Sequence, residues 1–323
     1  DAVVALDEYD ALTAADLREH FRLPGLGHTQ ARYFRDKLAM RTRAKRSRVR
    51  VPRFVRVVDH SEVARFLETV PPPWMMKPRM EASAMGIKRC EVPDDVWSHI
   101  EQLGDLQSHF LLEEFVEGIV FHVDSIVSAG KVLVSVPSRY ETPPLNVYQQ
   151  GGVFQTTTVD PESDRHMELT RVNARLLRSF GLAEGVAHAE FIQGDDDKLY
   201  FLEVASRVGG AGIDKLVEAA VGVNLWSEWA RLVALPLQGK TYELPELRSD
   251  QAGLLVCLSR EEHPDLSEFQ DEEVYWVLDK PHHAGLVLRS SSRKRLFRLL
   301  ADYRERFARQ FLATQPPLET APD

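Results

Sequence analysis

Two acidic residues, Glu190 and Glu203, lie in neighbouring strand-like runs within GVAHAEFIQGDDDKLYFLEVA, on either side of a turn cluster of Gly and Asp. Charges inside a fold are paired or bind metals. A hairpin with a two-residue turn at Asp195 and Asp196 would make the glutamates diagonal neighbours on one face, with Cβ atoms roughly 7–8 Å apart. A divalent cation then fits between the two carboxylates. The alternatives are a solvated hairpin whose acids share a face by chance, or a turn of odd length that separates them.

Cationic residues that could bind phosphate occur upstream of this hairpin. Lys77 closes a strand pattern in PWMMKPRMEASAMGI, and the loop of small residues after it could place backbone amides around phosphates. Lys37, in FRDKLAM, is a second candidate. In LLEEFVEG, the carbonyl of Glu114 and the amide of Val116 could pair with an adenine edge. Each feature has a simpler alternative, namely surface lysines and an acidic hairpin.

Arg207 follows the strand of Glu203 and precedes a pair of glycines. A guanidinium can hold a carboxylate or acyl-phosphate oxygen with two parallel hydrogen bonds. The alternative is an ion pair between Arg207 and Glu203. The two possibilities differ in their consequence, because only the first makes Arg207 necessary for chemistry.

The composition is that of an ordinary soluble globular protein. The chain has 323 residues, of which 44% are hydrophobic and 28% charged, enough for about two or three domains. The net charge of −9 argues against a general nucleic-acid binder. No apolar run approaches the ~20 residues needed to cross a bilayer, and nothing resembles a signal peptide. The two cysteines, Cys90 and Cys257, show no metal-binding spacing, which fits a reducing cytoplasm.

Helix and strand patterns alternate with antiparallel strand pairs, which predicts a mixed α+β fold. Residues 1–10 have a buried-strand pattern without a partner strand before it, so we expect an N-terminal part that is truncated or separately encoded. A long helix is predicted over residues 29–46. From about Gln238 a last unit has strand patterns over 252–259, 273–278 and 284–289, and a closing helix over 291–311.

Taken in chain order, the motifs RDKLAM, VPRF, MKPR..AS..GI, EEFVEG, HAEF and FLEVASR resemble the ATP-grasp superfamily over roughly residues 30 to 235. This resemblance implies an ATP-grasp fold, with one α+β subdomain over residues 31–116 and a second over 117–237 that grip ATP between them. It implies that residues 1–30 are the remnant of a preceding α/β domain and that 238–323 form a small C-terminal α+β unit. HAEF with EVASRVGG looks most like the carboxylate–amine ligases that make dipeptides and natural-product amides.

The resemblance also implies a nucleotide site. Lys37 and Lys77 would hold the ATP phosphates, a mobile lid over residues 82–86 would cover them, and the strand that ends in EEFV would bind adenine through its main chain. The nucleotide-binding residues implied are Lys37, Lys77, Ser83, Gly86, Glu113, Glu114, Phe115 and Val116.

The same resemblance assigns the catalytic parts. Glu190 and Glu203 would hold one or two Mg²⁺ ions, and Arg207 would clamp the acyl-phosphate. The amides of Gly209 and Gly210 would donate to the developing oxyanion. Cations are required because a carboxylate that attacks the γ-phosphate approaches another anion.

Two departures from the family pattern concern ligands. Ala205 stands where the family often has Asn, so one ion is held more weakly or water replaces the amide oxygen. Val120 stands where an acid commonly grips the ribose, which leaves that task to His122 or Asp124 on the same strand face, unless HVD is only a polar face. Arg139, after a strand in PSRYETPP, is a candidate for the substrate carboxylate, with a structural or solvated role as the alternative.

The expected function is an ATP-dependent ligase that activates a carboxylate as an acyl-phosphate and couples it to an amine. Its cofactors would be ATP and Mg²⁺. Its partners would be small carboxylates and amines, amino acids in the first place, with no nucleic acid or membrane; a homodimer is left open. The alternatives are a non-catalytic ATP-binding or regulatory module and a biotin-carboxylase-like carboxylase.

Overall fold

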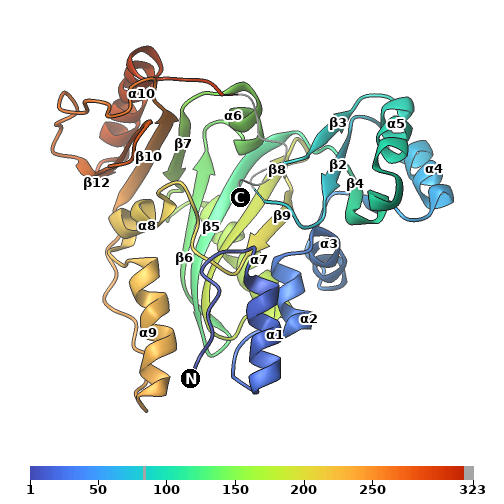
Figure 1. Cartoon of the computed structure of the whole chain (residues 1–323). Helices are drawn as coiled ribbons and strands as arrows, with labels where there is room; N and C mark the ends of the chain where they lie inside the picture. Colours follow the sequence, from blue (N-terminus) through green and yellow to red (C-terminus); the bar gives the residue numbers. More distant parts are fainter. Residues whose placement is uncertain (83–84, 316–323) are drawn as a thin grey trace.

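Two antiparallel sheets organise the chain in the computed structural model, which describes residues 1–82 and 85–315 (Figure 1). The smaller sheet has the order β1-β4-β2-β3, with β1 Phe54–Arg56, β2 Trp74–Pro78, β3 Lys88–Cys90 and β4 Phe110–Glu114. The larger has the order β11-β12-β10-β7-β6-β5-β8-β9, with β5 Gly118–Ser128, β6 Lys131–Tyr140, β7 Phe154–Thr158, β8 Gly185–Gly194, β9 Leu199–Ala205, β10 Gln251–Leu258, β11 Val274–Val277 and β12 His283–Ser290.

Two amphipathic helices cover one side of the smaller sheet, α4 (His60–Thr69) and α5 (Pro93–Leu103), followed by the short 3-10 helix η2 (Gly104–His109). The Asp59 carboxylate caps α4 by accepting from the Ser61 amide at 2.8 Å. Trp74 on β2 is fully buried between the sheet and these helices. The small sheet with α4 and α5 lies beside the large sheet (Figure 1), so the chain forms two lobes.

The two faces of the large sheet have different coverings. Strand alternation places Phe121 and Phe201 on the face that packs against α7 (Asp164–Phe180) and α3 (Lys37–Arg46). The other face packs part of its length against α8 (Ile213–Val221) and α9 (Leu225–Leu237), through residues such as Ile126 and Val186. Glu190 lies on this second face, beyond the part that α8 and α9 cover.

The N-terminal region departs from two expectations. Residues 1–9 form no strand, and no strand of the described chain pairs with them. The helix predicted over 29–46 is broken into α2 (His28–Ala31), the 3-10 turn η1 (Arg32–Phe34) and α3, after α1 (Ala11–Phe21). The break occurs because Asp36 caps α3, accepting from the Leu38 amide at 3.0 Å.

The predicted elements of the last unit are present as β10, β11, β12 and the helix α10 (Arg293–Gln310), which packs against β10 and β12. Strand β10 pairs with β7, so the last unit continues the large sheet and does not form a sheet of its own. The domain boundaries stay predictions. None of the described helices combines the length and apolar character that a membrane span needs.

Candidate active site

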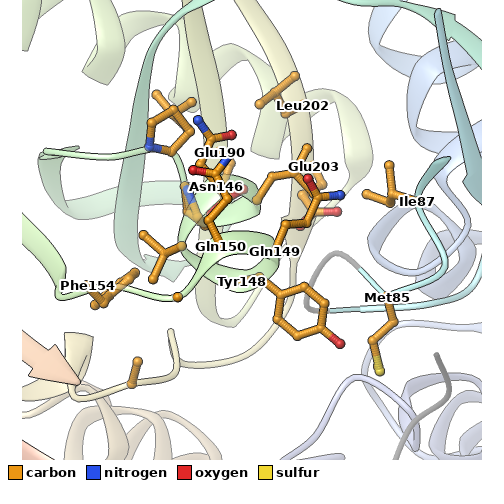
Figure 2. Close-up of a pocket in the computed structure, with 18 of the residues that line it drawn as sticks. Met85, Ile87, Asn146, Tyr148, Gln149, Gln150, Phe154, Glu190, Leu202 and Glu203 are labelled. Carbon is orange, nitrogen blue, oxygen red and sulfur yellow. The ribbon is translucent and has the colours of Figure 1, made fainter. Parts of the chain in front are cut away.

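A cavity of about 1370 Å³ lies between the two sheets. Lys37 and Lys77 line it from the side of α3 and the small sheet, and Glu190 and Glu203 line it from the large sheet. The short helix α6 (Pro144–Gln150) forms a further part of its wall, from which Asn146, Gln149 and Gln150 project toward the cavity (Figure 2). The volume exceeds what one drug-sized ligand usually occupies, so a nucleotide and further small molecules fit together.

Glu190 and Glu203 face each other directly across β8 and β9, which corrects the predicted register. The turn is not the two-residue one expected, because the Gly194 amide donates to the Lys198 carbonyl at 3.0 Å and leaves three aspartates, Asp195 to Asp197, in the loop. A turn of odd length alone would send Glu203 to the other face. A β-bulge at Leu202, between the pairs Glu190–Glu203 and Phe191–Phe201, restores it.

The two lysines are each held by a carboxylate. Lys37 Nζ lies 3.2 Å from Glu203 Oε2 and donates to the Glu81 carbonyl, while Lys77 Nζ lies 2.8 Å from Glu113 Oε2. Loss of hydration would raise the pKa of Glu203, but the positive charge of Lys37, followed by those of Lys77 and Arg41, lowers this pKa below its ordinary value. Both lysines thus bring positive charge to the wall of the cavity.

Glu113 does not line the cavity, although its motif suggested a nucleotide contact. Its side chain is fully buried, and its carboxylate also accepts from both Arg41 Nε and Arg41 Nη2. Burial alone would raise the pKa of Glu113, but the charges of Arg41 and Lys77 outweigh it and lower that pKa to about 2. Glu113 thus fixes Lys77 from behind.

The strand end predicted to bind adenine borders the cavity. Glu114, Phe115 and Val116 line it, and the apolar side chains of Met75 and Ile192 lie on its walls. The amides of Glu114 and Phe115 are already bonded, to the carbonyls of residues 53 and 73 at 2.8 and 3.2 Å. The predicted adenine contact uses the Glu114 carbonyl and the Val116 amide, and it stays a prediction.

His122 and Asp124, the candidates for the ribose, are both fully buried and do not line the cavity. Asp124 holds His122 Nδ1 at 2.6 Å and His188 Nδ1 at 2.9 Å, and His122 Nε2 lies 2.7 Å from Thr156 Oγ1. Burial would lower the pKa of His188, but Asp124 raises it to about 10. Because its members are buried and bonded to one another, this cluster does not reach a ribose in the described structure.

The loop after β9 lies close to this cluster. A Cβ atom at Gly209 would meet His188 Nδ1 at 2.9 Å and Asp124 Oδ1 at 3.0 Å, so only glycine allows the loop to approach so closely, whereas Gly210 is open.

Arg207 does not bridge Glu203. Its Nε donates to Glu8 Oε1 at 3.1 Å and its Nη1 to the Val208 carbonyl at 2.8 Å.

Arg139 and Gly86 do not line the cavity. Arg139 pairs across the ladder with Phe121, so it lies exposed on the α7 face, opposite to Glu190, and the predicted contact with a substrate carboxylate is wrong. Ser83 lies outside the described residues. Gly86, at the end of the predicted lid, has a φ of 66°, which favours glycine.

Sequence reasoning missed three participants. The first is α6, whose residues were interpreted only as lying between strands, although the prolines at 143 and 144 and the glycines at 151 and 152 bracket it. The second is Glu8, which pairs with Arg207. The third is Tyr140, whose hydroxyl donates to Glu190 Oε1 at 2.8 Å. The last two are long-range contacts, for which no local sequence signal exists.

Replacing Lys77 by Met is expected to weaken ATP binding roughly 10-fold or more, since a charge-assisted bond is worth roughly 1.5–3 kcal/mol. Glu113 retains Arg41, so the fold should persist. Calorimetry with a non-hydrolysable ATP analogue measures the change. The matched control is Lys198→Met, which removes a lysine that pairs with Asp196 at the hairpin tip. Equal affinities in both variants would contradict a phosphate role for Lys77.

The site and the fold together define a nucleotide-binding cleft of the ATP-grasp class. The family model described as the ATP-grasp domain matches residues 42–221, and the chain belongs to this family.

Among curated proteins, the chain is similar to the L-arginine-specific L-amino acid ligase of Bacillus subtilis, with 27% identity over 233 residues that make up 70% of this chain and 56% of the relative. It is also similar to carnosine synthase 1 of Homo sapiens, with 26% identity over 71% of this chain and 28% of that protein. A D-alanine–D-alanine ligase of Neisseria gonorrhoeae is 23% identical over 50% of this chain and 54% of the relative. The chain thus spans little more than half of these relatives, or less.

Solved structures agree on the fold. An L-amino acid ligase from Bacillus licheniformis superposes with a TM-score of 0.71 at 19% identity, over 98% of this chain and 81% of that one. N5-carboxyaminoimidazole synthetase from Staphylococcus aureus, complexed with ADP, gives a TM-score of 0.73 at 14% identity, over 95% and 80%. The expected ATP-grasp fold is therefore confirmed.

Proposed function

We propose that the chain is an ATP-dependent ligase that activates a carboxylate as an acyl-phosphate and couples it to an amine, with release of ADP and phosphate. The observation that carries this proposal is the directly opposed pair of Glu190 and Glu203 in a cavity that Lys37 and Lys77 also line. The ligase names of the similar curated proteins support amino acids as substrates. We further propose a cytoplasmic role in natural-product biosynthesis.

The residues present fit magnesium. Mg²⁺ prefers oxygen ligands and is commonly bound by one or two carboxylates together with substrate phosphates, which matches Glu190 and Glu203 facing one cavity. The methyl side chain of Ala205, which pairs with His188 in the ladder, offers no ligand atom. When bound, the ion would neutralise charge on the phosphates of ATP.

The side chains of the cavity would carry the remaining work. Lys37 and Lys77 bind the β- and γ-phosphates, and so orient the γ-phosphorus toward the substrate carboxylate. A carboxylate oxygen bonds to this phosphorus as the bond to the bridging oxygen of ADP breaks. The amine then bonds to the acyl carbon, phosphate leaves and the amine loses a proton. Arg207 would release Glu8 and hold the acyl-phosphate. Its guanidinium would then place positive charge beside the oxygens on which negative charge develops.

Incubation with ATP, Mg²⁺ and pairs of amino acids tests the proposal. We expect ADP and phosphate to appear only when both an acid and an amine are supplied, together with a new amide detected by mass spectrometry. ATP binding without ADP release would support the non-catalytic module instead. ADP release that depends on bicarbonate would support a carboxylase.

A further inference from the structure

The phenol of Tyr140 reaches a carboxylate two strands away. Tyr140 is the last residue of β6, Glu190 lies on β8, and β5 runs between them. Tyr140 is only 3% exposed, and its hydroxyl donates to Glu190 Oε1 at 2.8 Å. The hydrogen bond therefore crosses over β5.

The contacts of the Glu190 carboxylate are unequal. In the described part of the chain, its polar contacts are the Tyr140 hydroxyl and His188 Nε2, the latter at 3.6 Å, and both fall on Oε1. The Glu190 side chain as a whole is 16% exposed and lines the cavity. Oε1 is thus engaged by the protein, whereas Oε2 is left for a ligand.

The Tyr140 ring is itself held in place. It packs against the His122 ring at a centroid distance of 4.7 Å and against the Phe154 ring at 5.5 Å. His122 is in turn fixed by Asp124 on one ring nitrogen and by Thr156 on the other. A donor on so constrained a support defines one orientation of the carboxylate that accepts from it.

We propose that Tyr140 is a positioning residue that orients Glu190, so that Oε2 alone is presented to the divalent cation. The inference rests on the proposed function, because it takes Glu190 as a cation ligand. Hydrogen bonds to a liganding carboxylate fix its orientation, and their loss typically weakens metal binding about 10–100-fold. Glu203 is restrained differently, by Lys37 at its Oε2, which a bound nucleotide would draw away.

The test compares Mn²⁺ binding to the folded chain with saturating ADP, measured by the electron paramagnetic resonance signal of free Mn²⁺. Tyr140→Phe removes only the hydroxyl and keeps the ring, and it should bind Mn²⁺ about 10-fold more weakly. The matched control is Tyr200→Phe, which deletes a hydroxyl that bonds to Asp196 at 3.0 Å on the adjoining turn. Mn²⁺ affinity within twofold of the native value in Tyr140→Phe would overturn the proposal.

A double-mutant cycle with Glu190→Gln separates this inference from the function that it rests on. If Tyr140 acts through Glu190, its hydroxyl should have no further effect on Mn²⁺ affinity in the Glu190→Gln background. A general packing effect would instead persist there, and that would overturn the inference. Should Glu190→Gln leave Mn²⁺ affinity unchanged, Glu190 is no ligand, and the metal site of the proposed function falls with the inference.

Discussion

Glu203→Gln is expected to slow ADP release by at least about 10²–10³-fold, the usual result of removing one group that stabilises charge in a transition state. The amide is neutral, so Glu190 would be the only carboxylate of the pair that could balance the charge of a bound cation. Lys37 also loses its carboxylate partner, which lies 3.2 Å away in the native chain. We expect Mg²⁺-dependent nucleotide binding to weaken while the fold is retained, as a coupled ADP assay and a thermal unfolding curve would show.

The control for this variant lies in the same hairpin. Asp195→Asn removes a carboxylate from the exposed turn between β8 and β9, far along the ladder from the Glu190–Glu203 pair. Its turnover should match that of the native chain. Near-normal ADP release by Glu203→Gln would mean that the carboxylate pair is an ordinary feature of the hairpin.

Arg207→Lys is expected to fold and to bind Mg·ATP nearly normally. Its rate of product formation should fall by at least about 10³-fold. Lysine keeps the charge but loses the planar fork that holds two oxygens at once. The native guanidinium pairs with Glu8, and both side chains are partly exposed, at 21% and 15%. A lysine can still pair with Glu8, so the melting temperature should change little.

The outcome separates a clamp from a structural tie. If Arg207 serves only to anchor the N-terminal segment, Arg207→Lys will retain turnover, or it will lose thermal stability to the same extent as Glu8→Gln. Arg295→Lys is the matched control, because Arg295, on α10, is also held by carboxylates, those of Asp271 and Glu273. That variant should form product at the native rate.

Most of the fold could be predicted because strand and helix periods are local properties. The ranges expected for the C-terminal strands and helix lie within a few residues of β10, β11, β12 and α10. The helix break at Asp36 was missed, since the apolar period continues through a residue whose side chain caps a new helix. The pairing of β10 with β7 joins distant segments, and no local pattern reports it.

The residues that belong to sequence motifs could be predicted as parts of the site. The role of a residue could not be predicted where it depends on which other residues pack around it. Lys37, Lys77, Glu190 and Glu203 all line one cavity. The burial of His122 away from the cavity could not be inferred, because strand alternation specifies the face of the sheet on which a side chain lies and not whether other side chains cover it. Arg139 was assigned from its position after a strand, although alternation from Tyr140 already places it on the opposite face.

The bulge at Leu202 has a consequence for how this hairpin can change during evolution. In a regular ladder, two residues face each other across a turn of odd length only if an odd number of residues lies between them. An even number lies between Glu190 and Glu203, and Leu202, which is left out of the pairing as a bulge, brings the two carboxylates opposite each other. Deletion of Leu202 would therefore leave a regular ladder in which the carboxylates still face each other. A deletion among the three aspartates would preserve the pair if Gly194 and Lys198 stayed paired and the bulge stayed in place. A lineage can therefore lose the bulge residue, or change the length of the turn, without losing the carboxylate pair, provided that the Gly194–Lys198 pair is kept.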